Sequence, residues 1–94
     1  MIFGEPYPNP SASSVHTTLI LPESAETMAV EMVAYNIMGQ PVKSIVSASF
    51  HGGIHEVTWD GNDFSGSRVP AGMYILRPKV NGQPVNQLHK VILK

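Results

Sequence analysis

Short apolar runs separated by proline and glycine constrain this chain more than any other feature of its sequence. It contains eight prolines and eight glycines among 94 residues, and these two residue types interrupt helices and favour turns. Between them, apolar and polar residues alternate over roughly five to eight positions, at a spacing typical of a β-sandwich or barrel. The pattern predicts an all-β fold with strands at residues 17–21, 30–35, 42–50, 54–59, 72–77 and 88–94.

The alternation also indicates which side chains face the core. The inward positions that it predicts on two of the strands are Val30, Met32, Ala34, Val57 and Trp59. A large aromatic residue on a half-buried strand belongs in the core of a sandwich, so we expect Trp59 to be buried. Residues 24–35 also contain good helix formers, but the Pro and Gly residues on both sides favour a strand. Asn81-Gly82 predicts a hairpin turn.

Length and composition narrow the class of protein. A chain of 94 residues is one domain, and at 43% hydrophobic and 14% charged residues it can form a core, unlike a disordered tail. No apolar stretch of about 18 residues is present, so no transmembrane helix is predicted. The start of the chain does not resemble a signal peptide. We interpret the proline-rich residues 1–14 as an extended lead-in or linker and residues 15–94 as the domain.

Charge is distributed unevenly along the chain. Residues 1–63 hold all seven acids and one base, a net charge of −6, whereas residues 64–94 hold five bases and no acid. Segregation of this kind can indicate a partner that recognises one end of the molecule. Alternatively, the two halves interleave in the fold and the charges mix. The bases do not cluster and no aromatic residues interleave them, so nucleic acid is not an expected partner.

The residues that could carry chemistry do not form a recognisable site. His51 and His55 are four apart, but two glycines lie between them and disfavour the helix that a zinc-binding pair of this spacing needs. Residues 60–66 fail the ligand spacing of a calcium loop and fit a turn in which Asp and Asn bond their own backbone. No nucleophile elbow or phosphate-binding loop is present. The sequence therefore predicts no catalytic residue, no cofactor and no metal, and His55 is expected at the edge of the core.

Four blocks of sequence resemble a known family when they are taken in order. They are Tyr7-Pro8-Asn9-Pro10, the segment 35–42 (Tyr-Asn-Ile-Met-Gly-Gln-Pro-Val), the segment 55–61 (His-Glu-Val-Thr-Trp-Asp-Gly) with Asp63, Gly66, Val69, Gly72 and Tyr74 after it, and the terminal 90–94 (Lys-Val-Ile-Leu-Lys). In this order they resemble the C-terminal sorting domain of cargo proteins of the Bacteroidetes type IX (Por) secretion system. The Trp-Asp-Gly block is shared with the Ig-like domain of the flagellar hook-capping protein.

The resemblance implies an immunoglobulin-like β-sandwich of about seven antiparallel strands in two sheets. It also implies a function: a signal that directs an attached cargo across the outer membrane, with no enzymatic activity of its own. The implied partners are a translocon or shuttle component, a surface sortase-like cysteine peptidase and an N-terminal cargo domain. The implied location is the periplasm in transit, then the cell surface or the medium. The alternative is an accessory Ig-like spacer or binding module of the hook-capping type, without a sorting role.

The resemblance also assigns candidate recognition residues. They are Pro8, Asn9, Pro10, Gly39, Gly72, Tyr74, Lys90, Val91, Ile92, Leu93 and Lys94.

A mechanism for recognition follows if the last strand lies outermost in its sheet. Its free edge would then expose unpaired N–H and C=O groups, which another protein could pair by β-augmentation or a second copy could pair in weak self-association. Lys90 and Lys94 would keep that edge soluble and suit an acidic partner, while Val91 and Leu93 would pack inward.

Overall fold

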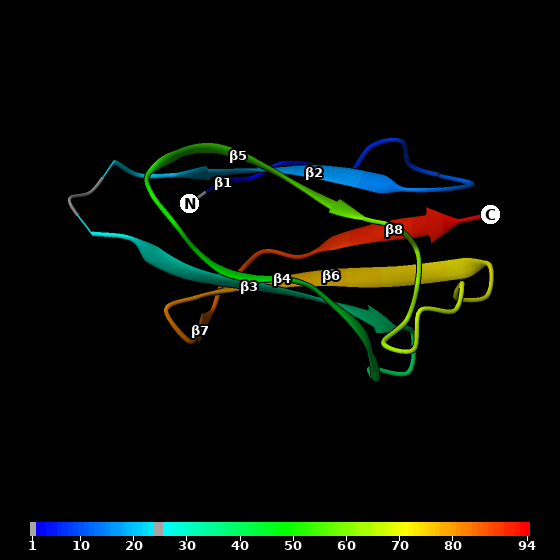
Figure 1. The fold of residues 1–94 in the computed structure, drawn as a ribbon. Coiled ribbons are helices and arrows are strands. Elements are labelled where there is room, and N and C mark those ends of the chain that lie inside the picture. Colours follow the sequence, from blue (N-terminus) through cyan, green and yellow to red (C-terminus); the bar gives the residue numbers. More distant parts are fainter. Residues whose placement is uncertain (1, 24–25) are drawn as a thin grey trace.

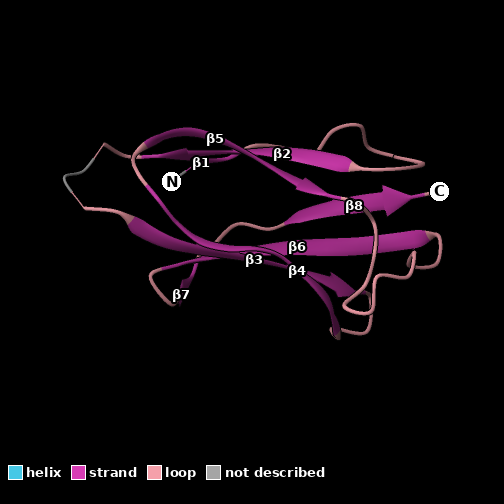
Figure 2. Cartoon of the chain, in the orientation of Figure 1, coloured by secondary structure: helices cyan, strands magenta, loops and turns pink. Residues whose placement is uncertain are grey.

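The computed structural model describes residues 2–23 and 26–94, and this part of the chain is built from β-strands and loops without a helix (Figures 1 and 2). Consequently, none of the described residues forms a helix that could span a membrane. The strands are β1 (Ile2–Phe3), β2 (Val15–Leu21), β3 (Met28–Asn36), β4 (Pro41–Phe50), β5 (Gly53–Trp59), β6 (Gly72–Val80), β7 (Gln83–Pro84) and β8 (His89–Leu93).

Two antiparallel sheets face one another across the core. The smaller sheet has the order β1-β2-β5, and the larger has the order β4-β3-β6, with both β7 and β8 paired to the far side of β6. This confirms the predicted all-β, immunoglobulin-like sandwich. The six expected strands are present, with ends that differ by a few residues. Only β1 and β7 were not predicted, because a strand of two residues is too short to show an alternating pattern.

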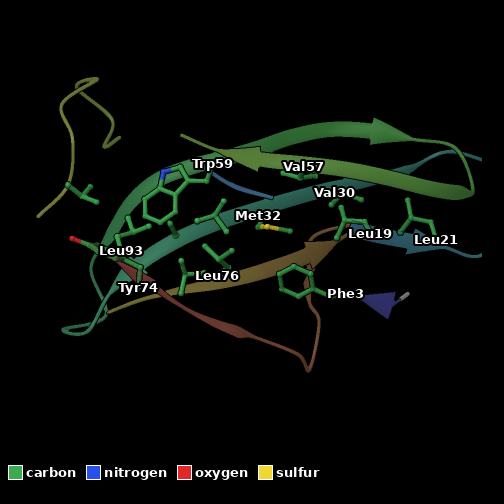
Figure 3. Close-up of a cluster of buried hydrophobic side chains, with 14 residues drawn as sticks. Phe3, Leu19, Leu21, Val30, Met32, Val57, Trp59, Tyr74, Leu76 and Leu93 are labelled. Carbon is green, nitrogen blue, oxygen red and sulfur yellow. The ribbon is translucent and has the colours of Figure 1, made fainter. Parts of the chain in front are cut away.

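Side chains from both sheets interlock in a single apolar core (Figure 3). Val30, Met32 and Ala34 all point inward from β3, with 1%, 0% and 0% of their surface exposed, as their alternation predicted. Trp59 lies at one end of this core and is 2% exposed, which confirms its predicted burial. The core is completed by residues from the remaining long strands, among them Leu19, Val57, Leu76, Val91 and Leu93.

Trp59 and Tyr74 join the end of β5 to the beginning of β6. Their rings meet edge to face, with centroids 5.4 Å apart, and lie side by side in Figure 3. The indole N–H of Trp59 donates to the carbonyl of Asn62 at 3.0 Å, and the hydroxyl of Tyr74 donates to the carbonyl of Pro70 at 2.6 Å. A tyrosine that bonds backbone a few residues upstream is the tyrosine corner of immunoglobulin-like domains. The two side chains thus satisfy their polar atoms while filling the core.

The proline-rich residues before β2 are paired to the rest of the sandwich. β1 pairs with the end of β2, and Tyr7 exchanges two backbone hydrogen bonds of 2.8 Å with His16. Phe3 and Ser11 are buried, at 4% and 2% exposure. Proline favours extended backbone and lacks an N–H, which suits a segment at the margin of a sheet. Residues 1–14 were expected to form an extended lead-in or linker; those that the structure describes, residues 2–14, pack against the sandwich, and the chain bends at residues 8–10 and 12–13.

The side chain of Tyr7 fastens this segment to the smaller sheet. Its hydroxyl donates to Oε2 of Glu56 on β5 at 2.9 Å, and its ring lies 5.6 Å from that of His16 on β2. The hydrogen bond to the Glu56 carboxylate, with a further contribution from partial burial, raises the pKa of Tyr7 above its usual 10.0.

The uneven charge of the sequence survives folding. β6 and β8 are neighbouring strands, and Arg77, Lys79 and Lys90 occupy positions on them that alternate with buried residues. These bases therefore share the outer face of the larger sheet. Glu31 lies opposite Lys79 on the adjacent strand and provides some mixing of charge.

Candidate functional site

The structure brings most of the predicted recognition residues together at the outer edge of β8. The side chain of Asn9 forms two hydrogen bonds there: its Nδ2 donates to the carbonyl of Lys90, and its Oδ1 accepts the N–H of Ile92, each at 3.0 Å. Ser11 forms two more through its backbone, donating to the carbonyl of Ile92 at 2.9 Å and accepting the N–H of Lys94 at 2.8 Å. Pro8 and Pro10 flank Asn9 and are exposed.

These four bonds correct the expectation of a free edge on the last strand. β8 does lie outermost among the strands of its sheet, but residues 9–11 already occupy the backbone groups that an incoming strand would need. The sequence could not indicate this, because a proline-rich segment has no strand pattern. Val91 and Leu93 are buried as expected, while Lys90 and Lys94 are exposed. Any recognition of β8 from outside would therefore involve its side chains, or would first displace residues 9–11.

Tyr74 and Gly72 adjoin β8 from its other side, where they pair with Val91 and Leu93. Tyr74 is 5% exposed, and burial raises the pKa of its hydroxyl. Gly39 lies apart from them in the turn between β3 and β4, where its φ of +81° is one that glycine adopts readily. Tyr74 therefore contributes to packing, and Gly39 contributes to the shape of a turn.

The turn that contains Gly39 holds two large apolar side chains in solvent. Oδ1 of Asn36 accepts the N–H groups of Met38 and Gln40, and its Nδ2 donates to Oε1 of Gln40, all at 3.0 Å. Ile37 and Met38, at the top of this turn, are 73% and 79% exposed. An Asn side chain that bonds backbone ahead of it in this way stabilises a tight turn. The turn therefore presents Ile37 and Met38 on a braced backbone.

The loop after β5 presents a third exposed apolar side chain. Oδ1 of Asp63 accepts the N–H groups of Ser65 and Ser67, at 2.9 and 3.1 Å, and the hydroxyl of Ser65 at 2.6 Å. These hydrogen bonds lower the pKa of Asp63 below its usual 3.8, and the bond from the Ser65 hydroxyl has the largest effect. Phe64, which lies between Asp63 and Ser65 in this turn, is 64% exposed. The self-bonded turn predicted for residues 60–66 is confirmed, since Asn62 likewise donates its N–H to the Asp60 carboxylate.

The two turns are attached to one another. The N–H of Phe64 donates to the carbonyl of Val42 at 2.9 Å, just beyond the β3–β4 turn, and both loops lie at the same end of the sandwich in Figure 1. We call Ile37, Met38 and Phe64 together the apolar tip. Large apolar residues exposed in a group are typical of surfaces that bind another molecule. The available sequence signal was the presence of bulky apolar residues inside turns rich in Asn, Asp, Ser and Gly.

The histidines considered as metal ligands have other roles. Nε2 of His55 lies 2.7 Å from the carbonyl oxygen of His51, and its ring lies 4.8 Å from that of Phe50. His55 is half-buried, at the edge of the core as expected. Across the described ranges, no three side chains from His, Cys, Asp and Glu are arranged to hold a metal ion.

Comparison with known proteins gives one distant structural likeness and one family. A search of curated proteins finds no match. Among solved structures, the chain is similar to Pseudomonas fluorescens alkylpurine DNA glycosylase AlkC bound to DNA containing an abasic site analog. The identity is 13% and the TM-score 0.46, over 86% of this chain and 24% of that one. The chain thus spans about a quarter of the length of that protein.

The family comparison corrects the resemblance drawn from the sequence. The family model that matches is that of the FlgD Ig-like domain, over residues 9–82. The assignment to the type IX sorting domains was therefore wrong, and the domain that shares the Trp-Asp-Gly block was the better choice. The match includes the turn at Gly39 and the loop at Asp63, and it ends before β8. The chain belongs to the FlgD Ig-like domain family.

Proposed function

We propose that this chain is an accessory Ig-like module that binds a partner protein through the apolar tip and performs no catalysis. The observation that carries the proposal is the exposure of Ile37, Met38 and Phe64 on two turns that are each braced by their own Asx side chain. Loops gathered at one end of the sandwich form the binding surface of immunoglobulin variable domains.

The side-chain hydrogen bonds that hold these turns favour binding, because they reduce the conformational entropy that the turns would lose when a partner binds. A flexible loop loses conformational freedom when it docks, whereas a turn held by three side-chain hydrogen bonds has already lost it. Full burial of a large apolar side chain contributes about 1.5–3 kcal/mol. Three such side chains would contribute about 4.5–9 kcal/mol. This is of the same order as the cost of association, about 4–15 kcal/mol, so the partner must also make contacts around the tip.

The charge beside the tip favours a protein partner. Asp63 flanks Phe64, and its carboxylate is ionised at neutral pH, as an aspartate with the usual pKa already is. A negative charge at this position disfavours contact with the phosphates of a nucleic acid or an anionic membrane. An apolar recess on a neutral or basic protein surface fits both features of the tip.

Site-specific photo-crosslinking in the native cell would test the proposal. A photoreactive residue replaces Met38 in one strain and Ala12, which is exposed on a different loop, in a matched control. We expect one protein adduct from position 38 and none of that mass from position 12, and we expect Asn36→Ala to weaken the adduct. The absence of an adduct, or the same adduct from both positions, would contradict docking through the tip.

Export of a cargo, the function that the earlier resemblance implied, remains a prediction that a separate experiment must test. Residues 6–94 fused to an inert reporter in a cell with the type IX system would remain periplasmic if the chain is an accessory module alone. Delivery of the reporter to the surface would show that the chain also acts as a sorting signal, in addition to any role as a binding module.

A further inference from the structure

The two sides of the sandwich are protected very differently. On one side, residues 3–11 run between the sheets: Nε2 of His89 lies 2.7 Å from the carbonyl oxygen of Phe3, and residues 9–11 cover β8. On the other side lie β4 and β5, the outer strands of their sheets. They are joined by the short turn at residues 51–52.

The outer edge of β4 is long and largely unoccupied. β4 has ten residues and pairs only with β3. Within the described part of the chain, its outer backbone forms a single hydrogen bond, in which the carbonyl of Val42 accepts the N–H of Phe64. Unpaired strand edges are templates for another strand, and proteins usually protect them with charge, proline, bulges or a covering segment.

The middle and end of β4 lack most of these protections. Pro41, Lys43 and an irregularity in the pairing to β3 at Val42 lie near its beginning. A second irregularity lies at Ile45, but from Ser44 to Phe50 no residue carries a charge. Ser47 and Ser49 are exposed, whereas Ile45, Val46 and Phe50 are half-buried and pack at the margin of the core. A strand laid along this edge would bond the free backbone groups and cover the remaining apolar surface.

We propose that residues 44–50 of β4 pair antiparallel with the same residues of a second copy of this chain. A two-fold antiparallel arrangement brings a segment against itself, so it is stable only if like charges do not meet. The uncharged run from Ser44 to Phe50 meets this condition. β5 does not offer the same edge, because it is shorter and bears Glu56 in its middle.

The geometry also predicts the strength and the form of the dimer. One pair of strands buries less surface than a standard protein interface, so association is weak and depends on concentration. Antiparallel pairing places the two Pro41 ends of β4, and with them the two apolar tips, at opposite ends of the joined sheet. Dimerisation therefore leaves both tips free and makes the proposed binding surface bivalent.

Sedimentation velocity over a range from about 10 µM to 1 mM would test the pairing. We expect the mass to rise with concentration from 10.2 kDa towards twice that value. Ser47→Lys with Ser49→Lys should abolish the rise, because four like charges would meet across the two-fold axis. Ala29→Lys is the matched control: it lies opposite Ser49 on the adjacent inner strand, is exposed, and should leave association unchanged.

Because the chain has no cysteine, disulfide trapping identifies the contact directly. Under mild oxidation, Ser47→Cys should form a covalent dimer at concentrations where Ala12→Cys, on the exposed loop before β2, stays monomeric. The proposal is overturned if the wild type stays monomeric to 1 mM, if the lysine pair leaves association intact, or if both cysteine variants cross-link equally.

Discussion

Truncation of Trp59 should remove a large share of the stability of this domain. Its side chain is 2% exposed, meets the ring of Tyr74 at 5.4 Å and donates its indole N–H to the carbonyl of Asn62. Trp59→Ala therefore removes apolar contacts, an aromatic pair and a hydrogen bond together. It also leaves a cavity at the end of the core where the loop after β5 is attached.

The expected loss is about 3–5 kcal/mol, the range for truncation of a buried tryptophan. At about 0.05–0.15 kcal/mol per residue, a domain of this size has a total stability of about 5–14 kcal/mol. For a domain in this size range each kcal/mol corresponds to about 4–8 °C in Tm, so Tm should fall by about 12–40 °C. The variant is expected to remain folded at low temperature but to unfold at a much lower denaturant concentration.

Urea unfolding followed by far-UV circular dichroism would measure the change, because Trp59 is the only tryptophan and its fluorescence is lost in the variant. Phe64→Ala is the control, since it truncates an aromatic side chain that is 64% exposed. It should alter stability by less than about 0.5 kcal/mol. A loss below about 1.5 kcal/mol for Trp59→Ala, or equal losses for the two variants, would refute the placement of Trp59 in the core.

Three further changes test other parts of the structure. Asn9→Ala removes both side-chain bonds to β8, so hydrogen exchange of the Ile92 amide should accelerate, and unchanged protection there would contradict the role of residue 9. Tyr74→Phe should lower stability by about 1 kcal/mol. Because the pKa of Tyr74 is raised, the extra free energy of unfolding of the wild type over Tyr74→Phe should be present below pH 10 and disappear as the pH rises through the folded pKa. An equal difference between the two proteins at all pH values would contradict this prediction. The pKa of Asp63 is lowered, so the contribution of its carboxylate to the stability of the fold should be present above about pH 4 and be lost as the pH falls through the folded pKa. Asp63→Asn should flatten acid unfolding, and an unchanged acid profile would contradict this.

Period-two alternation was sufficient to predict the long strands and their inward faces. On β3 the alternating residues Val30, Met32 and Ala34 are apolar and buried, because a strand between two neighbours has only one face towards the core. Burial of Trp59 followed from the same rule. These features depend on local sequence, so they could be read without knowledge of which strands pair.

The features that the sequence did not reveal depend on contacts between distant residues. The bonds from Asn9 to Lys90 and Ile92 join residues more than 80 positions apart, and nothing in the residues near Asn9 indicates them. The apolar tip was missed for a related reason. Ile37 and Phe64 are apolar, and the hydrophobic pattern alone does not distinguish an apolar residue in a core from one that a braced turn exposes.

The incorrect family assignment has a physical explanation in the roles of the matching residues. In the central block, Asn36 and Gly39 shape a turn. In the next block, Trp59 and Tyr74 fill one end of the core, and Asp63 closes a loop on itself. Each of these residues supports the sandwich, so any family that shares these turns and this corner needs the same residues, whatever its function. Such blocks identify the fold well and separate its families poorly. Residues that differ in function are to be sought where they do not support the fold, as at exposed positions 37, 38 and 64, or on the unprotected edge of β4.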